Sequence, residues 1–264
     1  MKPPPFQLVL ARSAGEAVAA LAEAGDDAKP IAGGQSLVPA LNMRLLRPTV
    51  LVDITRCDLD KIHVDGGQTV VGATVTQSTL QRSVHVPRLV AEALPYIGHV
   101  ATRNRGTVGG SIAHADAAAE LCTCLVACAG TVRTDRRRIP ADDFFLAPFT
   151  TALEPGELIL ATEWPPDDGN VAFEELALRR GDFALAMVAV ARGRVVVGSV
   201  GPAPFRLGEV EKLIAGETVT AGLAEEAGHL ATTLVDPPAS IHASARYLRE
   251  LTGVLVRRAL ERAA

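Results

Sequence analysis

Apolar residues near the start of the chain fall into short runs separated by helical spacings. Three runs predict strands, at residues 6–10, 29–32 and 50–54. Between the first two, Ser13 is followed three residues later by Glu16, the pattern of a helix capping box, and Gly25 is a suitable stop. A short helix is expected from Ser36 to about Arg44. These elements together predict a small α/β unit.

The middle of the chain has a different pattern. Alternating residues on either side of short turns predict two hairpins, at 61–72 and 131–139. Helical spacing predicts helices at 77–83, 87–99 and 117–129, and the last is apolar all round, so it should be buried. A further strand is expected at 158–164. Residues 106–116 are rich in glycine and only weakly periodic, so no element is assigned to them.

A linker is indicated at Pro165–Asn170, where prolines, acidic residues and glycine follow one another. Beyond it, apolar runs predict three strands, at 171–178, 184–191 and 195–200, and helical patterns follow at 207–215, 221–234 and 241–263. The sequence therefore predicts a domain over 1–166 and a C-terminal α+β domain over 167–264, with a three-stranded antiparallel sheet and helices.

Composition limits the class of protein. The chain has 264 residues, of which 48% are hydrophobic and 21% charged, which is ordinary globular usage and excludes a disordered, collagen-like or coiled-coil chain. The net charge of −4 offers no basic surface, so nucleic acid is not an expected partner. No apolar run has the length of a transmembrane segment, and the start of the chain lacks an apolar signal core, so a cytoplasmic location is expected.

The cysteines and histidines of the chain give little evidence for a metal or catalytic site. Cys122, Cys124 and Cys128 lie in one apolar segment, where a metal or iron–sulfur site is conceivable. Burial in the core is the favoured interpretation, because no fourth ligand accompanies them. His114 could approach a cofactor, but a lone histidine is more often structural. The remaining histidines show no spacing typical of a zinc site or a catalytic triad.

Two glycine-rich segments carry the strongest signal, one over residues 32–37 and the other over 105–112. Consecutive glycines let the backbone approach a ligand closely, and successive N–H groups can form an anion-binding nest. Ser36, Thr107 and Ser111 add hydroxyl groups. Two such segments suit a pyrophosphate, although each alone could be a plain turn. Neither matches the dinucleotide fingerprint or the P-loop, and neither has a lysine nearby, which disfavours NTP hydrolysis.

These segments resemble those of a known family. The run AGGQSLVP from Ala32, with the strand at 51–54, and the run RNRGTVGGSIAHAD from Arg103 are similar to the two flavin signatures of the FAD-binding subunits of molybdenum hydroxylases. That family includes the medium subunit of aerobic carbon monoxide dehydrogenase and the flavin domain of xanthine dehydrogenase. Further similar segments lie at 139–145, 155–159 and 180–184.

The resemblance implies a two-lobed, PCMH-type (vanillyl-alcohol-oxidase-like) FAD-binding domain, with lobes over about 1–55 and 56–166, followed by a C-terminal domain. FAD would lie between the lobes. The residues implied at its pyrophosphate are Ala32, Gly33, Gly34, Gln35, Ser36, Leu37, Thr107, Val108, Gly109, Gly110 and Ser111. No catalytic residue and no metal ligand are implied in this chain.

Four more positions match family contacts to the flavin. Asp116 and Glu120 match positions near the ribityl chain. Ile159 matches an apolar contact to the flavin or the adenine, and Phe183 matches an aromatic or aliphatic position against the isoalloxazine ring. Two alternatives stay open. Glu120, at the start of a helix, could serve only the helix dipole, and Phe183 could be a core residue that opens a strand.

The chain also departs from the family pattern. Ala117 stands where many members have proline, and the region Phe173-Glu174-Glu175 lacks a lysine that several members carry, which could alter the reduction potential or the acceptor. Gln35 stands where related oxidases that attach the flavin covalently have histidine. We therefore expect noncovalent FAD.

The resemblance implies an electron-transfer subunit. A molybdopterin-binding large subunit and a [2Fe–2S] small subunit would be its partners, in a heterohexamer with two copies of each. FAD would pass electrons to quinone, NAD or oxygen. The sequence of this chain does not reveal the substrate of the complex or its final electron acceptor. A free-standing FAD-dependent oxidase or dehydrogenase is the alternative. An assembly subunit without flavin is disfavoured by the intact glycine pairs.

Overall fold

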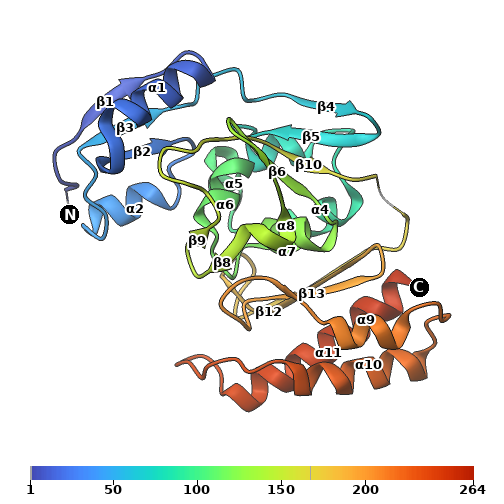
Figure 1. Cartoon of the computed structure of the whole chain (residues 1–264). Helices are drawn as coiled ribbons and strands as arrows, with labels where there is room; N and C mark the ends of the chain where they lie inside the picture. Colours follow the sequence, from blue (N-terminus) through green and yellow to red (C-terminus); the bar gives the residue numbers. More distant parts are fainter. Residues whose placement is uncertain (1, 167) are drawn as a thin grey trace.

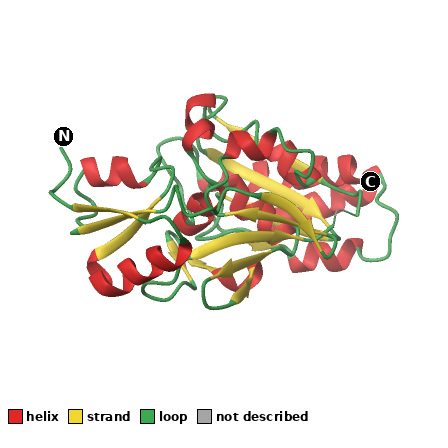
Figure 2. Ribbon diagram, turned by 90° about the horizontal axis from the view of Figure 1, so that it is seen from above, coloured by secondary structure: helices red, strands yellow, loops and turns green. Residues whose placement is uncertain are grey.

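The computed structural model describes residues 2–166 and 168–264. The chain begins with a three-stranded parallel sheet in the order β1-β3-β2. Its elements are β1 (Gln7–Leu10), α1 (Ala14–Ala24), a 3₁₀ turn (Gly25–Asp27), β2 (Ala28–Ile31), α2 (Leu37–Asn42) and β3 (Val50–Asp53). This small α/β unit occupies one end of the molecule, with helices on both faces of its sheet (Figure 2).

The start of α1 has the Ser13 half of the predicted capping box, while Glu16 reaches one residue further back than the box requires. Ser13 Oγ accepts a hydrogen bond from Glu16 N at 3.1 Å, and the Glu16 carboxylate accepts one from Arg12 N at 2.8 Å. The helix buries Ala17 and Leu21 against β3. The unit therefore forms as the apolar pattern predicts.

A five-stranded antiparallel sheet follows, in the order β4-β5-β10-β6-β7. Its strands are β4 (Ile62–Asp65), β5 (Gln68–Gly72), β6 (Thr131–Thr134), β7 (Arg138–Pro140) and β10 (Ile159–Trp164). Both predicted hairpins, β4–β5 and β6–β7, are confirmed. Gly66 and Gly67 at the first turn have φ of 56° and 82°, which L side chains rarely adopt.

The chain between these strands forms helices and a small β-hairpin that lie beside the sheet (Figure 1). They are α3 (Gln77–Gln81), α4 (Arg88–Ala93), α5 (Val100–Arg105), α6 (Val108–His114), α7 (Glu120–Ala127), α8 (Ala141–Phe144), β8 (Phe145–Ala147) and β9 (Thr150–Thr151). Every residue of α7 is buried, as its continuous apolar pattern predicts. The helix predicted over 87–99 instead ends at Ala93, and Gly98, with φ of 45°, lies before α5.

The glycine-rich segment to which the sequence assigned no element forms α6. Thr107 caps this helix, since its Oγ1 accepts from Gly110 N at 3.1 Å. A Cβ on Gly109 would lie 2.6 Å from Ala73 Cβ, so glycine here allows α6 to pack on the end of β5. The glycines weaken the periodic signal without preventing the helix, because packing and the cap stabilise it.

The C-terminal part is a four-stranded antiparallel sheet in the order β11-β12-β13-β14, with three helices. Its elements are β11 (Ala172–Ala177), β12 (Ala184–Ala191), β13 (Arg194–Gly198), β14 (Phe205–Arg206), α9 (Gly208–Ile214), α10 (Ala221–Leu234) and α11 (Ala245–Ala263). The three predicted strands are present, and the two-residue strand β14 adds a fourth at the edge of the sheet. Helix α11 begins later than predicted because Ser244 caps it, accepting from Tyr247 N at 3.2 Å.

The C-terminal sheet has helices on both faces. Val188 and Val190 belong to the core shared with α10 and α11, whereas Met187 and Ala189, which alternate with them along β12, belong to the core that includes α7. The buried helix α7 therefore joins the two large sheets into one packed body. The N-terminal unit has a separate small core.

Candidate functional site

The two glycine-rich segments meet in space. A Cβ on Gly33 would lie 2.0 Å from the carbonyl oxygen of Arg105, so only glycine allows the first segment to reach the second. Gly34 has φ of 70°, which turns the chain from β2 towards α2. The sequence identified both segments, but the contact of Gly33 with Arg105 could not be read from it.

The first segment leaves its backbone donors free. Within the described residues, the N–H groups of Gly33, Gly34, Gln35 and Ser36 donate to no protein acceptor. The Gln35 side chain donates from Nε2 to the Gly33 carbonyl at 3.3 Å, which braces the turn. Successive unpaired N–H groups in one turn form a concavity suited to an anion. The turn at residues 33–36 therefore leaves four backbone donors available to an anion.

The backbone donors of residues 108–111 in the second segment are used within the protein. Val108 N donates to Val75 O at 2.9 Å, Gly109 N to Ala73 O at 3.0 Å and Ser111 N to Thr107 O at 3.0 Å, while Gly110 N donates to the Thr107 cap. The prediction of a backbone nest here is therefore wrong at these N–H groups, because the carbonyls of Val75, Ala73 and Thr107 and the Thr107 hydroxyl already accept from them. The hydroxyl groups of Thr107 and Ser111 remain as donors.

The other predicted contacts are dispersed. Asp116, between α6 and α7, accepts from Ala118 N at 2.9 Å. Ile159 is only 4% exposed and lies in the core at the start of β10, whereas Phe183 is 75% exposed before β12. The alternative that Phe183 is a core residue is therefore wrong. Its exposed ring is open to a ligand or a partner.

Glu120 begins α7 and is 7% exposed. Burial raises the pKa of Glu120 to about 7, against the effect of its own backbone N–H, and Asp116 raises it further. Glu120 does lie at a helix start, which stabilises a carboxylate. Desolvation has the larger effect on its pKa. A carboxyl group that keeps its proton near neutral pH can both donate and accept hydrogen bonds.

Glu175 is a further acidic residue with an unusual environment, and no sequence motif pointed to it. Burial and the neighbouring Glu120 raise the pKa of Glu175 to about 8. A signal was present, because strand alternation places position 175 on the same face of β11 as the buried Phe173. An acidic residue on the inner face of a strand marks a group that needs an explanation.

The three clustered cysteines are core residues, as expected. Cys122, Cys124 and Cys128 are buried thiols, and burial raises the pKa of Cys122 and of Cys124. No group of side chains suited to a metal ion is found among residues 2–166 and 168–264. His114 lies beside Phe149, with 5.0 Å between ring centroids, in an aromatic contact near the end of α6.

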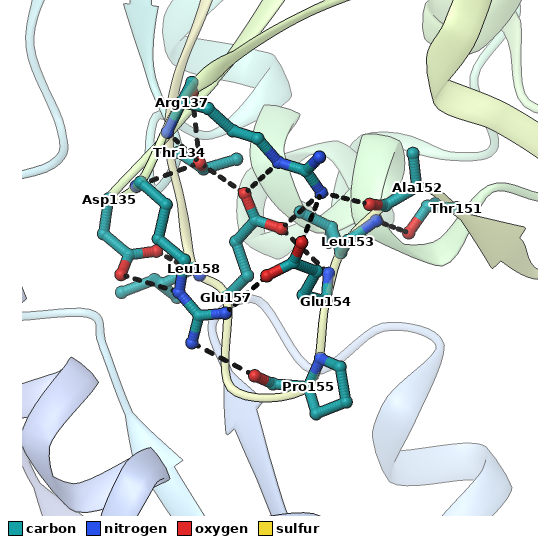
Figure 3. A network of polar contacts seen from close by, with 11 residues as sticks. Thr134, Asp135, Arg137, Thr151, Ala152, Leu153, Glu154, Pro155, Glu157 and Leu158 are labelled. Carbon is teal, nitrogen blue, oxygen red and sulfur yellow. Dashed lines mark hydrogen bonds and ion pairs between the residues drawn. The ribbon is translucent and has the colours of Figure 1, made fainter.

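A polar network holds the turn before Ile159 (Figure 3). The Glu157 carboxylate accepts from Thr134 Oγ1 at 2.7 Å, from Arg137 Nε at 3.1 Å and from Glu154 N at 2.8 Å. Burial alone would raise the pKa of Glu157, but these hydrogen bonds lower it to about 2. The network fixes the hairpin between β6 and β7 against the start of β10.

Two family models match the chain. The model described as FAD binding domain in molybdopterin dehydrogenase matches residues 4–167, and the model described as CO dehydrogenase flavoprotein C-terminal domain matches residues 171–263. The chain therefore belongs to the family of FAD-binding flavoprotein subunits of molybdopterin dehydrogenases. Its cofactor is FAD, and it is the flavoprotein subunit of a molybdopterin-dependent oxidoreductase. In complexes of the carbon monoxide dehydrogenase type, molybdopterin and the iron–sulfur clusters belong to other subunits.

Curated relatives match along the full chain. The subunit alpha of the 6-hydroxypseudooxynicotine dehydrogenase complex from Paenarthrobacter nicotinovorans is 37% identical, with 100% of this chain and 96% of the relative covered. The carbon monoxide dehydrogenase medium chain from Hydrogenophaga pseudoflava is 32% identical, with coverage of 100% and 98%.

Solved structures agree with the fold. A chain of quinoline 2-oxidoreductase from Pseudomonas putida 86 superposes with a TM-score of 0.93 at 33% identity, covering 100% of this chain and 98% of that one. A chain of a Cu,Mo-CO dehydrogenase in its cyanide-inactivated form gives 0.94 at 30% identity, with coverage of 100% and 99%. The mixed helix and sheet fold of this flavoprotein subunit is thus confirmed. No helix in the described part of the chain is long and apolar enough to cross a membrane.

Proposed function

We propose that this flavoprotein subunit carries electrons from a [2Fe–2S] small subunit to an external acceptor. The observation that carries the proposal is the free donor turn at Gly33–Ser36, which lies directly against the second flavin signature through the contact of Gly33 with Arg105. An electron carrier needs a tightly held flavin, and this junction supplies backbone donors where a pyrophosphate needs them.

The two glycine-rich segments contribute different groups to FAD binding. Ala32, Gly33, Gly34, Gln35, Ser36 and Leu37 form the donor turn, and Thr107 and Ser111 offer hydroxyl groups from α6. Val108, Gly109 and Gly110 shape the helix start, since their N–H groups are already used. Asp116, Glu120, Ile159 and Phe183 complete the site on the side of the ribityl chain and the ring.

Bound FAD supplies the electron-accepting ring, and the protein supplies position and exclusion of water. Gln35 has an amide where covalent attachment would need a histidine nucleophile, so the FAD is held noncovalently. Glu120 is protonated in part at neutral pH, because burial raises its pKa to about 7, and in that form it can donate to an acceptor of the flavin. The Glu157 network holds the start of β10 in place behind Ile159.

We also propose the domain organisation that the sequence predicts, with lobes over about 1–55 and 56–166 and a C-terminal domain over 167–264. Support comes from the separate small core of the N-terminal unit. The two family models, over residues 4–167 and 171–263, support the boundary near residue 167.

The proposed assembly contains a molybdopterin-binding large subunit and a [2Fe–2S] small subunit, two copies of each with two of this chain. Relatives named as medium chains, or as a subunit of a dehydrogenase complex, support partners of this kind. A cytoplasmic location is part of the proposal, because Cys57, Cys122 and Cys124 are reduced thiols, as a reducing compartment favours.

Purification of the chain alone tests the proposal. One FAD per chain should be released into the supernatant by acid or heat, and the chain alone should not oxidise small alcohols or amines with common acceptors. Colour that stays with the precipitated protein would contradict noncovalent binding. Robust oxidation by the chain alone would favour the free-standing oxidase. Co-expression with its neighbouring genes should recover the two partner subunits.

A further inference from the structure

Strand β1 is an edge of the N-terminal sheet. Within the described residues it pairs with β3 alone, in the order β1-β3-β2. Gln7 N donates to Thr49 O at 2.8 Å, directly before β3, so the odd-numbered residues of β1 direct their backbone groups to that side. Because these groups alternate along a strand, those of Leu8 and Leu10 face away from the sheet. The outer side of β1 therefore offers donors and acceptors to another strand.

The side chains of β1 are uncovered on one face of the sheet. Leu8 and Leu10 are 51% and 56% exposed, and Phe6 precedes them on the same face. Leu51, which pairs with Leu8 from β3, is only 1% exposed. This face is thus covered over the middle strand and open over the edge strand. On the opposite face, Val9 packs against the small core of the unit.

The loop after α2 adds apolar residues near β1. Arg44 Nε donates to Lys2 O at 3.5 Å, which holds the loop beside the residues that lead into β1. Figure 1 shows β1 on the side of the unit that faces away from the rest of the molecule. Exposed apolar residues that gather in one region mark an interaction surface. We call the exposed apolar residues of the strand and the loop the edge patch: Phe6, Leu8, Leu10, Met43, Leu45 and Leu46.

The opposite edge of the sheet is protected against pairing. Strand β2 contains Pro30, which has no N–H group to offer, and the exposed Lys29, whose charge opposes the approach of another strand. Residues 6–10 contain neither a proline nor a charge. An exposed apolar edge without such protection promotes aggregation, and natural proteins cover edges of this kind. The contrast between the two edges favours a partner on β1.

The charges beside the edge patch are basic. Lys2, Arg44 and Arg47 are exposed, and none of the three forms an ion pair within the described residues. We call these three residues the basic rim. Two copies of this chain joined through the edge patch would bring their basic rims together, and this repulsion disfavours a second copy. The surface instead fits a partner that carries acidic residues beside an apolar segment.

We propose that an extended segment of a partner subunit adds to β1 as a further strand, with apolar side chains on the edge patch and acidic residues against the basic rim. This inference rests on the proposed function, which includes two partner subunits. In strand addition the free backbone groups give affinity and the exposed side chains give specificity. A membrane surface would leave the backbone groups of Leu8 and Leu10 unpaired in an apolar medium, which disfavours it.

Hydrogen exchange tests the proposal on the isolated chain and on the co-expressed complex. The amides of Leu8 and Leu10 should exchange freely in the isolated chain, because they face away from the sheet. In the complex they should exchange at least about tenfold more slowly, because a partner strand supplies acceptors. The Val9 amide, which faces β3, should be slow in both and is the internal reference. Equally fast exchange of Leu8 and Leu10 in the complex would overturn the proposal.

Charges placed on the edge give a second test. Leu8→Lys combined with Leu10→Lys should lower the recovery of partner subunits by at least about tenfold, since charged residues oppose edge pairing. The melting temperature and FAD content should match wild type, because both side chains are already exposed. Ile241→Lys is the matched control, since Ile241 is 95% exposed in the C-terminal part. Equal recovery from the double variant and the control would contradict the proposal.

The outcomes separate strand addition from the proposed function. If wild type recovers no partner subunit, the proposed assembly fails and strand addition fails with it. Recovery without protection of Leu8 and Leu10 overturns strand addition alone. So does a dimer of the isolated chain that protects these amides, or binding of the isolated chain to vesicles of phosphatidylserine and phosphatidylcholine. If the double variant does not fold, Leu45→Glu in the exposed loop replaces it and should repel the acidic segment.

Discussion

The two glycine-rich segments look alike in sequence and differ in use. Both contain glycines that packing requires, since a Cβ would lie 2.0 Å from Arg105 O at Gly33 and 2.6 Å from Ala73 Cβ at Gly109. The first segment leaves the N–H groups of residues 33–36 free, whereas residues 108–111 of the second donate theirs to Ala73, Val75 and the Thr107 cap. A glycine pair thus signals close approach of backbone, and what approaches can be a ligand or the protein itself.

Gly33→Ala should have the largest effect. The new Cβ would force the first segment away from Arg105 and displace the free donors, so at least two charge-assisted hydrogen bonds to FAD are lost. At about 1.5–3 kcal/mol each, affinity should fall by roughly two to four orders of magnitude. Flavin fluorescence titration measures this. Gly208→Ala is the matched control, because a Cβ there meets nothing within 4 Å.

Gly109→Ala should act first on stability. Its Cβ would overlap Ala73, and overpacking of this kind lowers the free energy of unfolding by about 1–3 kcal/mol. FAD affinity, measured where the variant is folded, should fall much less than in Gly33→Ala. Equal losses of affinity in the two variants would mean that the segments act alike.

Gly110→Val should also weaken FAD binding. A Cβ at this position would lie 2.7 Å from Thr107 Oγ1 and so disturb the Thr107 cap.

Thr107→Val separates the cap from the hydroxyl contact. Loss of the cap should lower the free energy of unfolding by about 1 kcal/mol. Loss of the hydroxyl should weaken FAD binding by about tenfold, the value of one hydrogen bond near 1.4 kcal/mol. Thr220→Val removes the equivalent cap of α10, whose Oγ1 accepts from Leu223 N at 3.3 Å, and should lower stability without changing FAD affinity.

Ser36→Ala should have the smallest effect. Its side chain makes no cap hydrogen bond to α2, so removal should leave the melting temperature unchanged. FAD affinity should fall only a few-fold, because the backbone N–H groups of the turn remain. A loss as large as that of Gly33→Ala would show that the hydroxyl, and not the backbone, holds the anion.

Much of this could be predicted from the sequence, and the limits have physical reasons. The N-terminal unit, both hairpins and buried α7 followed from local periodicity and caps. Helix α6 was missed because its glycines are chosen by contact with Ala73, a residue distant in the chain. Glu175 was missed because its raised pKa depends on burial and on Glu120, which is distant in the chain, and periodicity does not reveal such neighbours. Local pattern predicts elements, and tertiary contact decides which polar groups are left without partners.

The Glu157 network also has a consequence for local opening of the chain. Glu154 N and Leu158 N lie in a turn outside regular structure, yet each donates to a carboxylate, Glu157 at 2.8 Å and Asp135 at 2.7 Å. Their amide hydrogens should therefore exchange with deuterium as slowly as those of the neighbouring sheet. This turn and the β6–β7 hairpin should open together, as one cooperative unit, so that a loop becomes as rigid as the strands it connects.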